Sequence, residues 1–114
     1  MAFVPLHNLD QWESLLKDSY AAPIVVMKHS ATCGISAYAY ELLSRGFQSG
    51  ELTAPVHVLV VQQSRDLSNH IADALAVRHQ SPQILVISKG QCRFNCSHHS
   101  ITAGAVSEAV RDSG

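Results

Sequence analysis

Three short apolar runs constrain the fold of this chain most. Each run holds four to six residues, and they occupy positions 24–27, 56–61 and 84–87. The runs are rich in β-branched residues and too short for helices, which is typical of strands. A strand that is apolar without alternation has both of its faces covered by other elements. The chain is therefore predicted to build a sheet with buried strands.

Helical periodicity accounts for most of the remaining sequence. Apolar residues recur at helical spacing in four segments, at about 9–18, 34–46, 67–75 and 102–111. Asn8 and Thr102 are suited to cap the first and last of these helices, and Gly46 offers a stop for the second. Lys89-Gly90 is a turn signal, so residues 91–96 are expected to return as an antiparallel strand.

The resulting order of elements is αβαβαββα. Crossovers through helices require parallel neighbouring strands, whereas the final hairpin adds an antiparallel edge. This order predicts an α/β fold with a central mixed four-stranded sheet flanked by helices, which is the arrangement of the thioredoxin-like fold. A chain of 114 residues suits one hydrophobic core, so we expect a single domain over residues 1–114.

Charge and composition disfavour several classes of partner. Eight Lys and Arg nearly balance nine Asp and Glu, and no run gathers like charges, so neither nucleic acid nor a membrane surface is expected as a partner. The longest apolar stretch is far shorter than the roughly 20 residues that span a bilayer, and the N-terminus has no secretory pattern. We therefore expect a cytoplasmic protein. Three cysteines, an odd number, do not resemble the disulfide framework of a secreted domain.

Cys33 is the candidate nucleophile, because it falls where a predicted strand leads into a predicted helix. Unpaired N–H groups and the positive end of the helix dipole favour a thiolate there, and the thiolate is the form that attacks disulfides. Lys28 and His29, just upstream, would add positive potential if their side chains turned toward the sulfur. We group Lys28, Thr32 and Ser36 as residues expected to support the thiolate.

The segment from Cys33 to Ser36 has the spacing of a dithiol redox motif, but its second position is a serine. Because residues 33 and 36 lie one turn apart on a helix, Ser36 is expected to donate a hydrogen bond to the Cys33 thiolate. It cannot form a disulfide, so the motif predicts a monothiol mechanism that stops at a mixed disulfide. The alternative is that Cys33 is an ordinary buried cysteine.

Two further segments are predicted to lie near Cys33. Ser81-Pro82 precedes the third apolar run, where a cis bond would bring its backbone beside the start of the second helix. His98 and His99 precede the last helix, in a loop that lies near the nucleophile in this fold. We expect Ser81, Pro82 and His98 to bind substrate, the alternative for the histidines being solvated loop residues.

Cys92, Cys96, His98 and His99 are close enough in sequence to suggest a metal site. On a regular strand, however, residues 92 and 96 would share one face at a separation of about 13 Å. That distance is too long for a shared ion and exceeds the limit of roughly 7 Å for a disulfide. No metal site is therefore predicted, and the two cysteines are interpreted as small apolar strand residues.

Residues 28–36 resemble the signature of the monothiol bacilliredoxins of the YtxJ type, a Thr-Cys-Pro-Ile-Ser motif after a Lys-His-Ser run. Residues 67–71, 79–83 and 97–102 are also similar to later segments of that family, so the resemblance extends from about 24 to 110. It implies a thioredoxin-like fold, Cys33 as the functional cysteine, and S-thiolated client proteins as partners. It further implies no bound cofactor, with a low-molecular-weight thiol such as bacillithiol as co-substrate.

Gly34 departs from the proline that is usual in the family. The motif consequently also resembles the Cys-Gly-Phe-Ser of monothiol glutaredoxins, which use the cysteine with glutathione to hold an iron–sulfur cluster. The glycine pair with which those proteins grip glutathione is missing before the last helix, where residues 97–100 read Ser-His-His-Ser. The bacilliredoxin interpretation is therefore favoured. An iron–sulfur carrier and a binding module with an inert cysteine remain the alternatives.

Overall fold

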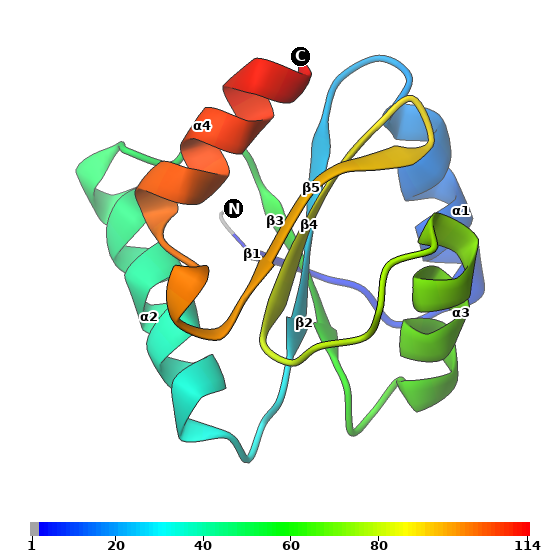
Figure 1. Ribbon diagram of the computed structural model, residues 1–114, viewed down its shortest axis with the longest axis horizontal. Helices are drawn as coiled ribbons and strands as arrows, with labels where there is room; N and C mark the ends of the chain where they lie inside the picture. Colours follow the sequence, from blue (N-terminus) through cyan, green and yellow to red (C-terminus); the bar gives the residue numbers. More distant parts are fainter. Residues whose placement is uncertain (1–2) are drawn as a thin grey trace.

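The computed structural model describes residues 3–114 as a five-stranded mixed sheet between two layers of helices (Figure 1). The strands are β1 (Phe3–Pro5), β2 (Ile24–His29), β3 (Val56–Val60), β4 (Gln83–Ser88) and β5 (Gln91–Ser97). The helices are α1 (Leu9–Asp18), α2 (Gly34–Ser49), α3 (Arg65–Leu75) and α4 (Ala103–Ser113), with a short 3₁₀ helix η1 (His98–Ser100) before α4. The strand order across the sheet is β1-β3-β2-β4-β5.

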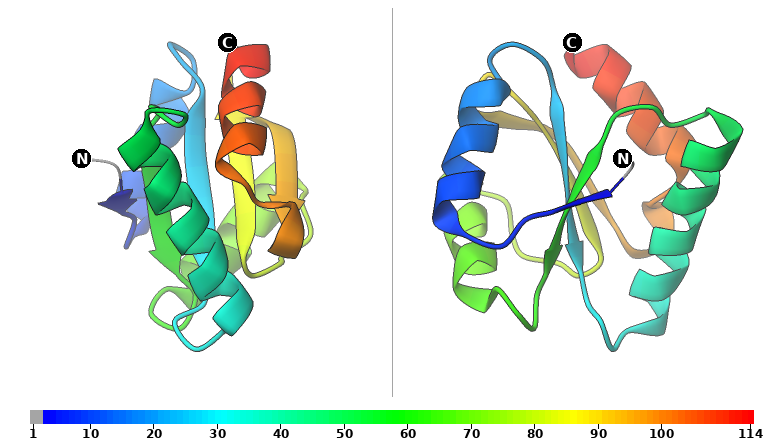
Figure 2. Two further views of the ribbon diagram at one scale, coloured as in Figure 1. Left: turned by 90° about the vertical axis from the view of Figure 1, so that its left-hand side faces the viewer. Right: turned by 180° about the vertical axis from the view of Figure 1, so that it is seen from behind.

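The sheet separates two hydrophobic clusters. Helices α2 and α4 cover one face and α1 and α3 the other, as Figures 1 and 2 show. Val25 and Met27 of β2 pack in the α2–α4 cluster, whereas Ile24 and Val26 pack in the α1–α3 cluster with Trp12. All residues of β4 are buried. The prediction of strands covered on both faces is thus confirmed for β2 and β4. Within residues 3–114, no helix is long and apolar enough to cross a membrane.

The sheet has one strand more than predicted. Strand β1 pairs in parallel with β3, and Phe3 lies opposite Val56 in that register. The strand is only three residues long and ends in Pro5, so it shows neither alternation nor an apolar run. An edge strand tolerates such a sequence because one of its sides makes no ladder hydrogen bonds.

The sequence predicted some of the helix ends correctly. Asn8 and Thr102 cap α1 and α4 as predicted, since their side chains accept from the N–H groups of Gln11 and Ala105 at 2.9 and 3.1 Å. Helix α2, however, does not stop at Gly46. It continues to Ser49, and Gly50 with φ of 83° ends it.

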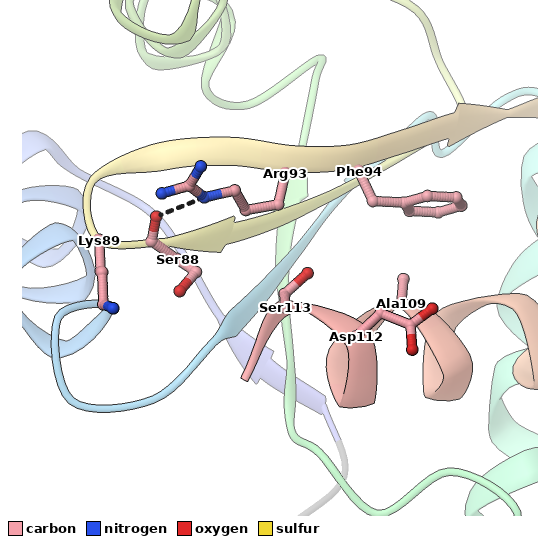
Figure 3. A pocket seen from close by; sticks show the side chains of 7 residues that line it. All are labelled: Ser88, Lys89, Arg93, Phe94, Ala109, Asp112 and Ser113. Atoms are coloured by element: carbon pink, nitrogen blue, oxygen red, sulfur yellow. Dashed lines mark hydrogen bonds between the residues drawn. The ribbon is translucent and has the colours of Figure 1, made fainter.

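A bulge in β5 overturns the expectation that Cys92 and Cys96 share one face. Val86 lies opposite Phe94 and Ile87 opposite Cys92, so Arg93 is an extra residue in the ladder. Its Nε donates to the Ser88 carbonyl at 3.3 Å, while Phe94 points toward α4 (Figure 3). Because an extra residue inverts the alternation of side chains, Cys96 packs with the α2–α4 cluster and Cys92 with the α1–α3 cluster. The sheet lies between the two thiols.

Candidate active site

Cys33 is the N-cap residue of α2, at the edge of the sheet where β2 ends. Its backbone is extended, with φ of −104° and ψ of 124°, and its carbonyl accepts from the N–H of Ala37 at 3.0 Å. The thiol is half-buried and unpaired, and it makes no side-chain cap bond. The sulfur therefore lies where the positive end of the α2 dipole stabilises negative charge. The predicted position at a strand-to-helix junction is confirmed.

Ser36 is buried beneath this junction and is held by residues that precede Cys33. Its Oγ accepts from the N–H of Ser30 at 2.9 Å and lies 2.9 Å from Nδ1 of His29. No hydrogen bond in residues 3–114 reaches the sulfur of Cys33, so the expected bond from Ser36 to this sulfur is not formed in the structure. The spacing of the motif predicted the proximity of the two residues but not the competing partners of Ser36.

Gln62 holds the loop before Cys33 by three hydrogen bonds. Its Oε1 accepts from the N–H of Ala31 at 3.1 Å, and its Nε2 donates to Oγ of Ser30 at 2.8 Å and to Oγ1 of Thr32 at 3.3 Å. Thr32 thus supports the loop rather than the sulfur itself. Gln62 was not predicted as a site residue, although a signal existed in the sequence: the carboxyl ends of parallel strands meet at one edge, and Gln62 follows β3, the parallel neighbour of β2.

Lys28 does not turn toward the sulfur, contrary to our expectation. Side chains alternate along β2, and Met27 faces α2, so Lys28 projects to the opposite face. There its side chain has no exposed surface, and its Nζ donates to the carbonyl of Ser68 in α3 at 2.9 Å. Nζ also lies 3.4 Å from Nδ1 of His79. Burial lowers the pKa of Lys28 from 10.5 to about 8, and burial, followed by Lys28 and Arg65, lowers the pKa of His79.

The two segments predicted to bind substrate meet at the same edge of the sheet. The Ser81-Pro82 bond is cis, and the N–H of His98 donates to the carbonyl of Pro82 at 3.1 Å. His98 has φ of 54°, and η1, which it begins, packs against α2. The Oγ of Ser81 is buried and has no hydrogen-bond partner among the described residues. Binding of substrate by these three residues remains a prediction.

A cavity of about 480 Å³ lies at the other end of the sheet (Figure 3). It is bounded by the turn between β4 and β5 and by the last residues of α4, including Lys89, Arg93 and Asp112. Strand β4 runs antiparallel to β2, so this turn is opposite the edge that carries Cys33. The cavity is therefore not part of the candidate active site.

The fold and the site together define a thiol protein of the thioredoxin-fold class. A solved structure described as having a thioredoxin fold aligns with a TM-score of 0.83 and 32% identity, covering 95% of this chain and 93% of that one. The thioredoxins of Schistosoma mansoni and Fasciola hepatica align with TM-scores of 0.75 and 0.72, both at 15% identity. These alignments cover 100% of this chain and 100% of the first, and 97% of this chain and 99% of the second.

The chain belongs to the monothiol bacilliredoxin family. The family model described as Monothiol bacilliredoxin BrxC matches residues 4–106, which include every residue of the candidate site. Membership assigns the protein to a thiol redox family, as the position of Cys33 indicates.

Proposed function

We propose that this protein is a cytoplasmic thiol–disulfide exchange protein that takes a low-molecular-weight thiol, bacillithiol, from mixed disulfides on client proteins. The observation that carries the proposal is a single half-buried cysteine at the N-cap of α2, with Ser36 where a dithiol motif has its second cysteine. Membership in the monothiol bacilliredoxin family supports bacillithiol as the small thiol.

The chemistry is a thiol–disulfide exchange that needs no oxidant. The Cys33 thiolate attacks the small-thiol sulfur of the mixed disulfide, so a new sulfur–sulfur bond joins Cys33 to the small thiol. The bond to the client breaks, and the client sulfur leaves as a thiolate that takes a proton from solvent. A second molecule of the small thiol then attacks the adduct, which releases the disulfide of the small thiol and frees Cys33.

The other two cysteines are poorly suited to resolve this adduct within the chain. Burial raises the pKa of the Cys92 thiol and raises that of Cys96 to about 11, so both stay protonated near neutral pH. Cys92 also lies in the α1–α3 cluster, whereas α2 with Cys33 covers the other face of the sheet. These features support resolution by an external thiol.

The proposal is tested by mixing the reduced protein with a client that carries one bacillithiol and measuring both intact masses. We expect the client to lose the adduct and this protein to gain it, and Cys33→Ser to abolish the transfer. A client that keeps its adduct, under conditions where a known thiol exchanger removes it, would overturn the proposal. An internal disulfide from Cys33 to Cys92 or Cys96 would instead show a dithiol mechanism.

A further inference from the structure

His29 and Ser36 form a hydrogen-bonded pair beneath Cys33 that the exchange chemistry described above does not use. The Ser36 hydroxyl has one proton and two lone pairs. One lone pair accepts from the N–H of Ser30, and Nδ1 of His29 lies 2.9 Å from the same oxygen. Ser36 has no exposed surface, so bulk water does not compete for this hydroxyl. The Ser36 hydroxyl proton must therefore be donated to a neighbouring acceptor within the protein.

The protonation state of His29 decides where that hydroxyl points. While Nδ1 of His29 carries no proton, the Ser36 hydroxyl donates to the ring. Once Nδ1 is protonated, the ring donates to Oγ instead, and the hydroxyl proton is released from this bond. Cys33, the N-cap residue of α2, is three positions before Ser36, and its sulfur is a hydrogen-bond acceptor when it is a thiolate.

We propose that His29 is a positioning residue that takes up the proton of Cys33 through Ser36. Because the sulfur makes no hydrogen bond within residues 3–114, the exchange requires a rotation of the Cys33 side chain that brings its thiol to Oγ of Ser36. The Ser36 hydroxyl then passes its own proton to Nδ1 of His29 and receives the thiol proton in its place. The products are a Cys33 thiolate and a His29 imidazolium, with the new hydroxyl directed at the sulfur and Nδ1–H donating to Oγ. Net charge and the number of protons are conserved, and the proton on His29 is later released to solvent.

The surroundings of His29 suit this exchange. The ring lies 5.3 Å from the ring of Tyr40 and borders a cavity of about 390 Å³ beside β1, which gives protons a route to and from solvent. Besides His29, the titratable groups lining the cavity are His7 and Tyr40, and no carboxylate or Lys or Arg lines it. Burial lowers the pKa of His29, which favours the neutral ring, and in the tautomer that carries its proton on Nε2 the Nδ1 atom is able to accept a proton.

The test is the pH profile of Cys33 alkylation by iodoacetamide, followed by intact mass. We expect His29→Gln to slow alkylation about tenfold at pH 7, the loss of one hydrogen bond to a charged group, with equal rates restored near pH 10. The matched control is His57→Gln, another half-buried histidine, which lies opposite Val26 in the sheet and should leave the profile unchanged. An unshifted profile for His29→Gln would overturn the proposal.

A double variant separates a relay from a merely structural effect. Because His29 acts through Ser36, the variant with both His29→Gln and Ser36→Ala should alkylate no more slowly than Ser36→Ala alone. Additive losses would contradict the coupling.

A measurement on the unmodified chain avoids any effect of substitution on folding. Nitrogen NMR of the His29 ring should show proton uptake at a higher pH when Cys33 is free than when it is alkylated, and identical titrations would refute the proposal. The inference rests on Cys33 being the reactive thiol of the proposed function. Since these assays use neither client nor bacillithiol, their failure is distinct from a failure of the exchange itself.

Discussion

At the scale of the residue, burial of the Lys28 ammonium lowers the stability of the fold, because the charge loses its hydration. Its ammonium has a backbone carbonyl and the neutral ring of His79 as neighbours, with no carboxylate among the hydrogen bonds and ion pairs of residues 3–114. The unfolded chain holds this proton up to a pH near 10.5, whereas the folded chain holds it only up to about 8. The unfolded state therefore binds more protons between these values, so the stability of the fold rises with pH across that window.

We predict that Lys28→Met raises the free energy of unfolding at pH 7 by about 1 to 3 kcal/mol, because it removes the desolvation penalty of the charge. The gain should shrink as the pH rises from 8 to 10.5. Chemical denaturation at several pH values measures both effects. Lys17→Met, on the exposed side of α1, is the control and should change stability by less than about 0.5 kcal/mol. A destabilised Lys28→Met variant would contradict the prediction.

The three cysteines should differ widely in reactivity. Cys33 lies at a helix N-terminus, whereas burial raises the pKa of Cys92 and Cys96. We therefore expect a single fast modification by a thiol reagent at pH 7, absent in Cys33→Ser, followed by two slow ones. Peptide mapping after timed labelling identifies each site. Fast labelling of Cys96 would show that its burial against the α2–α4 cluster is wrong.

At the scale of the element, the loop from Ser30 to Thr32 owes its shape to the side chain of Gln62. We predict that Gln62→Ala slows alkylation and exchange at Cys33 several-fold while costing about 1 kcal/mol of stability, since the lost bonds are exposed. The neighbouring Gln63→Ala is a matched control, because the side chain of Gln63 is exposed and makes no hydrogen bond within residues 3–114. Equal rates for the two variants would remove the role that we assign to Gln62.

Some elements were predictable from the sequence and others were not, for identifiable reasons. Strands β2 and β4 are covered on both faces, so their short apolar runs predicted them as buried strands. The face of β2 on which Lys28 emerges depends on which helix covers it, and that depends on the three-dimensional packing. The bulge at Arg93 leaves no mark in the spacing of Cys92 and Cys96, because an extra residue changes the register of a strand and not its composition.

At the scale of the whole molecule, helices α2 and α4 meet at Gly46. A Cβ atom at this position would lie 2.4 Å from the Cβ of Ala103, the first residue of α4. Gly46 was predicted to end the helix, but glycine occurs both at helix ends and where two backbones approach closely. Only the packing of two helices that are distant in sequence distinguishes the two uses.

We predict that Gly46→Ala lowers the free energy of unfolding by about 1 to 3 kcal/mol, the usual cost of overpacking a close contact. Gly34→Ala is the matched control in the same helix, because nothing lies within 4 Å of a Cβ at that position. It should be neutral or stabilise by up to about 1 kcal/mol, since alanine favours helices over glycine. Thermal unfolding followed by circular dichroism distinguishes the two, and a stable Gly46→Ala variant would show that α2 and α4 shift apart freely.

Because of the extra residue in β5, the sheet carries one cysteine thiol on each of its faces, and each thiol can report on the helix layer that covers it. Cys92 is half-buried against the α1–α3 layer and Cys96 against the α2–α4 layer, although they are four positions apart in one strand. Since each thiol is partly covered by its own layer, its labelling by a thiol reagent should accelerate when that layer detaches from the sheet. The ratio of the two slow labelling rates, followed through increasing denaturant, therefore shows whether the two halves of the core open as one cooperative unit or separately.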